Sequence, residues 1–167
     1  MQKLHPKAVW LFFISFLLSG LIAFIFLSFW LGSFLAQIGG LGYLWWVLLV
    51  FILFVIFCWI WAKLTYRFWR YQLTEEAFKK EHGVIWKKYV SIPYERIQNV
   101  DIYRGVIARI LGLSDLQIQT AGASAVVYGR RMAGVGAEGR LPALDKNVAE
   151  QLREELIRRA KGAKQGL

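Results

Sequence analysis

The sequence predicts a helical membrane hairpin followed by a mainly-β domain of the α+β class that ends in one helix. Two long apolar runs without charge predict the hairpin. After about residue 77, apolar residues recur at every second position, which is typical of half-buried strands. Near the C-terminus the period changes to that of an amphipathic helix. Such a helix must bury its apolar stripe against a sheet face or an open barrel end.

Both apolar runs are long enough to cross a bilayer. Residues 8–31 and residues 41–62 contain no charged side chain, and about 20 apolar residues span the hydrocarbon core. The link at residues 32–40 is short, which predicts antiparallel neighbouring helices. Small residues on the first helix favour packing against the second, with a contact to another membrane helix as the alternative. These small residues are Ser15, Ser19, Ala23, Ser28 and Gly32.

Basic residues flank the outer ends of the two runs and are absent from the link. Lys3 and Lys7 precede the first run, and Lys63, Arg67 and Arg70 follow the second. The positive-inside rule therefore predicts a multi-pass protein of the plasma membrane with both termini in the cytoplasm. Neither run contains an Asp, Glu, Lys, Arg or His side chain, which argues against an ion or proton pathway within this chain.

Period-two alternation marks the strands of the second half. A strand with one charged face precedes three that alternate apolar and polar side chains, and residues 75–76 and 82–83 predict turns. The predicted strands are residues 77–81, 84–94, 100–103 and 116–120. The strand order within residues 123–144 stays open, because Gly and Ala dominate the first part of that segment.

Two further segments predict helices. Residues 105–112 favour one short helix that a terminal glycine stops. Residues 145–161 carry an apolar stripe, and Asp145 or Asn147 can cap their start. The predicted core residues are Tyr94, Ile97, Leu116, Leu152 and Leu156. For Trp69 and Trp86 two roles stay open, anchoring of the domain at the lipid surface and packing in its core.

We expect three parts along the chain. Residues 1–65 form the two-helix anchor, residues 66–161 the cytoplasmic domain, and residues 162–167 a flexible tail.

Three motifs of the second half carry a family resemblance. They are FWRYQLTEEAF at residues 68–78, HGVIWKKYVSIPYERIQNVDI at residues 82–102 and RILGLSDLQIQTAG at residues 109–122. Together they resemble the YdbS-like family of bacterial membrane proteins, which carry a pleckstrin-homology-like (bacterial PH) domain. The resemblance implies a seven-stranded, strongly bent antiparallel barrel capped by the C-terminal helix. The Gly- and Ala-rich residues 123–139 depart from the family pattern.

No motif in the sequence predicts catalysis. His5 and His82 have no nucleophile motif beside them, Cys58 is the single cysteine, and no paired-carboxylate, metal-ligand or cofactor pattern occurs. No nucleic-acid reader motif explains the net charge of +10. We therefore predict a non-enzymatic membrane scaffold whose domain binds a protein partner through an edge strand or the cleft beside its capping helix. The partner is an unidentified membrane or cytoplasmic protein, with another PH-domain membrane protein as one candidate.

Recognition of membrane lipids is the alternative function. Basic residues near the second run can contact anionic headgroups, each contributing about 1 kcal/mol at an anionic leaflet. The candidate contacts are Lys63, Arg67, Arg70, Lys79, Lys80, Lys87 and Lys88. A third interpretation is that these charges only set topology and solubility.

Overall fold

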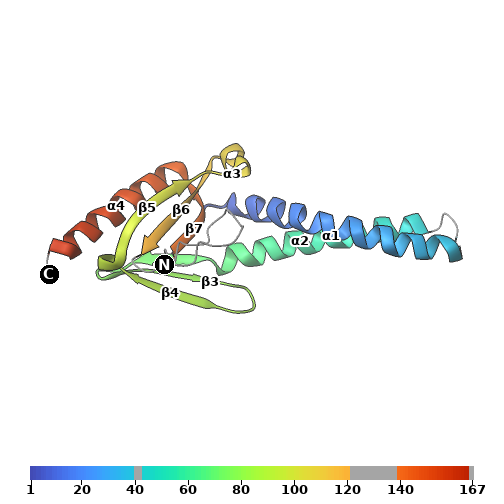
Figure 1. The fold of residues 1–167 in the computed structure, drawn as a ribbon, viewed down its shortest axis with the longest axis horizontal. Coiled ribbons are helices and arrows are strands. Elements are labelled where there is room, and N and C mark those ends of the chain that lie inside the picture. Colours follow the sequence, from blue (N-terminus) through green and yellow to red (C-terminus); the bar gives the residue numbers. More distant parts are fainter. Residues whose placement is uncertain (40–42, 121–138, 166–167) are drawn as a thin grey trace.

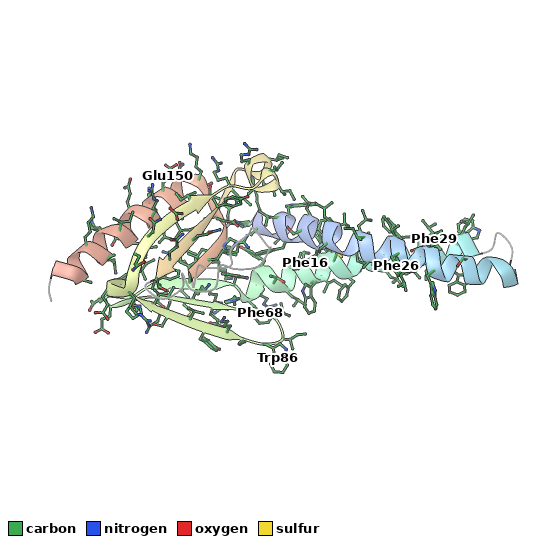
Figure 2. The ribbon with its side chains drawn as sticks, in the orientation of Figure 1. Phe16, Phe26, Phe29, Phe68, Trp86 and Glu150 are labelled. Atoms are coloured by element: carbon green, nitrogen blue, oxygen red, sulfur yellow. The ribbon has the colours of Figure 1, made fainter. Side chains whose placement is uncertain are left out.

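The apolar half of the chain forms two long antiparallel helices that extend from one end of a globular domain (Figure 1). The computed structural model describes residues 1–39, 43–120 and 139–165. Helix α1 is Ala8–Gly39 and helix α2 is Tyr43–Phe68. Their outward side chains are apolar, as Phe26 and Phe29 show (Figure 2). Both helices are long and apolar enough to be transmembrane helices.

Helix α1 continues through most of the segment that we expected to form the link. That expectation was wrong at its start, because residues 32–39 contain no proline and their two glycines only weaken a helix. The predicted antiparallel pairing is confirmed.

Aromatic side chains and one glycine form the contact between α1 and α2. Trp10 lies 4.9 Å from Trp59, ring centroid to ring centroid, and Phe24 lies 5.5 Å from Phe54. A Cβ atom on Gly20 would lie only 2.6 Å from the Phe54 ring. Three of the small residues that we expected at this contact, Ser15, Ser19 and Ala23, are instead exposed. They lie on a different side of the helix from Gly20 and Phe24, so the expectation was wrong for them.

The globular domain consists of two antiparallel sheets and a covering helix. The first sheet contains β1 (Gln2–Lys3), β2 (Arg70–Leu73), β3 (Ala77–His82) and β4 (Lys88–Pro93), in that order. The 3₁₀ helix η2 (Tyr94–Arg96) leads to the second sheet of β5 (Ile97–Tyr103), β6 (Leu113–Thr120) and β7 (Gly139–Asp145). The remaining helices are α3 (Val106–Leu111) and α4 (Lys146–Gln165). This arrangement is consistent with the predicted PH-like domain.

The predicted helix boundaries are confirmed at two ends and wrong at a third. Gly112 ends α3 with a φ of +73°, a conformation that glycine adopts without strain. The Asp145 carboxylate accepts the Asn147 N–H at 3.0 Å and caps α4. Helix α4 continues to Gln165, so residues 162–165 are helical and not the expected tail.

The core lies between the sheets and α4. All five predicted core residues are at least 92% buried, with Leu152 the most exposed at 8%. The largest fully buried side chains include Phe78, Ile92, Leu113 and Leu141. Helix α4 packs against β5 and η2 and contributes its apolar stripe.

The N-terminal residues complete the domain before the chain enters the membrane. Gln2 pairs with Tyr71 and Lys3 with Arg70, so β1 extends the first sheet. Leu4 is 3% exposed in the core, and the His5 N–H donates to the Ala143 carbonyl at 3.4 Å. We expected these residues to belong to the anchor, because a single apolar residue between Lys3 and His5 gives no periodic signal.

Leu4→Ala should therefore destabilise the domain. Removing a buried leucine side chain costs about 2–5 kcal/mol. Val148→Ala, at a site that is 40% exposed, serves as the control and should change stability by less than about 1 kcal/mol. Urea unfolding of the detergent-solubilised chain measures both. Equal effects would contradict the burial of Leu4.

Candidate functional site

The seven candidate lipid-contacting residues lie in three places. Lys63 and Arg67 occupy the last turns of α2, Lys87 directly precedes β4, and Lys88 is the first residue of β4. Arg70, Lys79 and Lys80 lie on β2 and β3. Six of the seven are exposed, whereas Lys80 is 7% exposed. Lys80 shares the inward face of β3 with Phe78, two residues before it, and therefore points into the domain.

Lys80 is held in a cluster between the first sheet and β7. Its Nζ donates to the Arg140 carbonyl at 3.3 Å and lies 5.9 Å from the centroid of the Trp69 ring. Trp69 in turn stacks on His82 at 4.7 Å. Burial, together with the smaller effect of the positive charges of Lys88 and Arg140, lowers the pKa of Lys80 to about 8. Burial also lowers the pKa of His82. These contacts make Lys80 a packing residue rather than a surface contact.

A basic strip lies at the C-terminal end of α2. We define this proximal strip as Lys63, Arg67 and Lys87. The Lys63 Nζ lies 5.2 Å from the Trp59 ring and the Lys87 Nζ lies 5.8 Å from the Phe68 ring, both measured to ring centroids. Such cation–π contacts hold long side chains against an apolar surface. The nearest carboxylate to Lys87 is that of Glu81, at 3.9 Å.

An ion pair between a buried carboxylate and a partly exposed guanidinium joins β6 to β7. The Asp115 carboxylate, 5% exposed, accepts hydrogen bonds from the Arg140 guanidinium and from the Ala143 N–H. Ala143 has a φ of +56°, which is unusual for a residue with a side chain. The strand register shifts between Ser114 and Leu116. Sequence alternation did not identify this interaction, because a bulge changes which face a residue occupies.

A polar cluster clamps α4 to the turn between β2 and β3. The Arg159 guanidinium donates to the Thr74 carbonyl at 2.7 Å and to the Tyr94 hydroxyl at 3.3 Å. Its Nε also donates to Glu155 at 2.6 Å. The hydrogen bonds that Glu155 accepts from Arg159 and Arg158 lower its pKa, whereas burial raises the pKa of Tyr94. Sequence reasoning missed the cluster, although Glu155 and Arg159 have the i,i+4 spacing of a helical ion pair.

Two clefts flank α4. The first has a volume of about 570 Å³ and lies between β1, β2 and the N-terminal half of the helix, with Tyr71, Leu73 and Leu152 among its lining. The second, which we call the distal cleft, has a volume of about 840 Å³. It lies beside the C-terminal end of α4, and its lining includes Thr74, Glu75, Glu76, Pro93, Tyr94 and Glu95. Within the described ranges, no three His, Cys, Asp or Glu side chains lie close enough together to hold a metal ion.

Comparison with known proteins identifies the family. The bacterial PH domain family matches residues 11–160, which is most of the chain. The chain belongs to the bacterial PH domain family. This bacterial PH protein is 27% identical to the UPF0699 transmembrane protein YdbS of Bacillus subtilis (strain 168) over 123 residues, 74% of this chain and 65% of YdbS.

A second relative extends the family to a longer protein. The UPF0699 transmembrane protein YdbT of Bacillus subtilis (strain 168) is 31% identical over 109 residues, which are 63% of this chain and 20% of YdbT. The bacterial PH protein thus spans about a fifth of YdbT and just under two thirds of YdbS. No solved structure matches it. The family match and the two apolar helices together make it a membrane protein with a bacterial PH domain.

Replacing Lys80 by Met should remove a pH dependence of stability. The pKa of Lys80 falls from 10.5 to about 8 on folding, so between these values the unfolded chain binds more protons. The wild-type free energy of unfolding should therefore rise relative to Lys80→Met across this interval, by on the order of 3 kcal/mol. Urea unfolding in detergent at several pH values measures the difference.

The exposed neighbour provides the control for this prediction. Lys79 is adjacent to Lys80 but points to solvent, so the difference between the wild type and Lys79→Met should stay constant with pH. A constant difference for Lys80→Met as well would contradict the buried ammonium.

Proposed function

We propose that this chain is a non-catalytic membrane scaffold whose PH domain binds a protein partner in the distal cleft. The observation that carries the proposal is the position of this cleft. It is lined by the β2–β3 turn and the C-terminal end of α4, at the end of the domain opposite to the transmembrane helices (Figure 1). A partner in the aqueous phase therefore has free access to it.

The chemistry of the distal cleft favours a basic segment. Glu75, Glu76 and Glu95 lie exposed in its lining. Two basic side chains among the described lining residues, Lys79 and Arg159, oppose these three carboxylates, and Arg159 is itself paired with Glu155 at 2.6 Å. The cleft therefore carries a net negative charge although the whole chain carries +10. Charge complementarity of this kind steers association and selects the partner.

The comparisons are compatible with a role inside a membrane assembly. The domain matches part of a protein about five times longer than the matched segment as well as the shorter YdbS. A domain that occurs in transmembrane proteins of different lengths is compatible with a module that mediates association between proteins. A membrane or cytoplasmic protein is the proposed partner, and another PH-domain membrane protein is one candidate.

Recognition of anionic lipid headgroups is the second candidate function. The specific observation in its favour is the proximal strip of Lys63, Arg67 and Lys87, which lies where α2 leaves the membrane. Lys80 does not contribute, because its ammonium is bound to the Arg140 carbonyl inside the domain. The proximal strip and the distal cleft lie at different ends of the domain, so variants can separate the two functions.

Charge reversal in the distal cleft tests the scaffold proposal. The tagged chain is purified in mild detergent after crosslinking in its native membranes, and the bound proteins are identified by mass spectrometry. We expect a stoichiometric partner with the wild type and its loss with Glu75→Lys/Glu76→Lys, because the charge change repels a basic segment.

The control places the same charge change outside the cleft. Glu150→Lys/Glu154→Lys lies on the exposed side of α4 and should retain the partner. A wild-type chain that carries lipid but no protein contradicts the scaffold proposal and supports headgroup recognition. Point variants are preferable to truncation, because β1 and β2 of one sheet lie on either side of the membrane helices in the sequence.

We also propose that both termini lie in the cytoplasm, because Lys3, Lys7, Lys63 and Arg67 flank the outer ends of the helix pair. Reporter fusions after Gly39 and after Leu167 should then report opposite sides of the membrane. The same side for both fusions would contradict the hairpin.

A further inference from the structure

Large apolar side chains of the PH domain are exposed at the end that faces the membrane. Outside α1 and α2, and within the described residues, the large hydrophobic side chains with high exposure are Met1, Ile85, Trp86, Tyr89, Tyr103, Val106, Ile110 and Val148. Of these, Ile85 and Trp86 lie in the loop between β3 and β4, and Val106 and Ile110 lie on α3. Both segments lie at the end of the domain from which the helix pair extends (Figure 1).

The β3–β4 loop lies beside the end of α2. Strand β3 contacts α2, His82 stacks on Trp69 at 4.7 Å, and the Lys87 Nζ lies 5.8 Å from the Phe68 ring. Gly83 makes the turn with a φ of +115°, and a Cβ there would lie 1.9 Å from the Trp86 carbonyl oxygen. The loop projects Trp86 from its tip on the membrane side (Figure 2). Trp86 is 86% exposed, which is unusual for so large an apolar side chain.

Helix α3 forms a second apolar projection, beside α1. The two helices contact each other, and Figure 1 shows α3 on the α1 side of the helix pair and the β3–β4 loop on the α2 side. Val106 and Ile110 are four residues apart and therefore share one face of α3, with exposures of 66% and 79%. Ala108 is buried in the core, so the opposite face of α3 packs against the domain. The exposed face of α3 thus continues the apolar surface of α1.

The length of α2 places these projections at the depth of the lipid headgroups. Its uncharged part, residues 43–62, is about 30 Å long, which matches the hydrocarbon core. The last turns, residues 63–68, extend about 9 Å further and cross the headgroup layer. Since Lys87 contacts Phe68, the neighbouring loop tip lies within reach of that layer. Tryptophan is enriched at this depth in membrane proteins.

We propose that the β3–β4 loop and α3 are two bilayer-insertion elements that flank the transmembrane pair. Ile85 and Trp86 enter the interface beside α2, and Val106 and Ile110 enter it beside α1. The occupant of this surface is the lipid bilayer itself, because the surface is continuous with the membrane-embedded helices. Residues 83–88 and 105–112 contain no acidic side chain, so nothing in them repels an anionic leaflet. The inference depends neither on a protein partner nor on selection of a headgroup.

Depth-dependent quenching in the full chain tests the insertion. With Cys58→Ala as background, an environment-sensitive fluorophore is attached at Ile85→Cys, at Ile110→Cys, or at Arg96→Cys as an exposed control in η2 at the distal end. The chain is reconstituted into phosphatidylcholine vesicles with or without a lipid that carries a spin label near the headgroup. We expect a blue shift and quenching at residues 85 and 110 and neither at residue 96. Equal behaviour at the three positions overturns the proposal.

A second variant pair separates insertion from structural effects. Trp86→Ser should reduce the quenching at residue 85, because the anchoring side chain of the loop is lost. Tyr89→Ser, on the same hairpin and 68% exposed at a distance from the tip, should leave it unchanged. A Trp86→Ser chain that is quenched as strongly as the wild type would show that Trp86 does not anchor the loop.

Lipid charge and salt distinguish apolar insertion from headgroup attraction. Burial of apolar side chains does not require lipid charge, so quenching at residue 85 should persist in uncharged vesicles and at high salt. Quenching that requires phosphatidylglycerol and disappears at high salt would overturn apolar insertion in favour of electrostatic adherence.

Discussion

The pairing of β1 with β2 is the constraint on which the rest of the structure depends. Strand β1 precedes α1 and β2 follows α2, yet Gln2 pairs with Tyr71 and Lys3 with Arg70. The membrane hairpin is therefore closed at its base by a sheet of the PH domain. Because Leu4 and Tyr71 are buried in the same core, the domain cannot rotate about α2 as it would on a single flexible linker. The position of the β3–β4 loop and α3 beside the helix pair follows from this junction.

Two buried charged side chains fix the position of β7 in the PH domain. Lys80 and Asp115 are nearly inaccessible, and each binds β7, through the Arg140 carbonyl and the Ala143 N–H respectively. Burial of an ion is unfavourable unless hydrogen bonds compensate it. The two contacts hold β7 in one register against both sheets, including the left-handed conformation of Ala143. A strand that slipped by one residue would lose both partners.

The sequence predicted the elements more fully than their junctions. Apolar length identified both membrane helices, and alternation identified the strands around Ile92, Val100 and Ile118, because these signals are local. Contacts between distant segments left no such signal: β1 is two residues long, and the Asp115 bulge breaks the alternation. We included Lys80 among the candidate lipid-contacting residues because of its position in the sequence. The pleat of β3, however, turns its side chain into the domain. Only the fold could decide between the two roles left open for Trp69 and Trp86. It half-buries Trp69 and exposes Trp86.

The two ends of the domain differ in chemistry, and under the two proposals this difference would link membrane contact to partner binding. A helix hairpin alone fixes where the domain is but leaves its tilt to thermal motion, whereas insertion on both the α1 and α2 sides would fix the tilt as well. The distal cleft would then stand at a constant height above the leaflet, with Glu75 and Glu76 turned toward the aqueous phase. A partner that is itself bound to the membrane would reach the cleft at a high effective concentration only if its binding segment lay at the same height above the leaflet as the cleft. The apolar loop and α3 would thus select partners by geometry, and the acidic cleft would select them by charge.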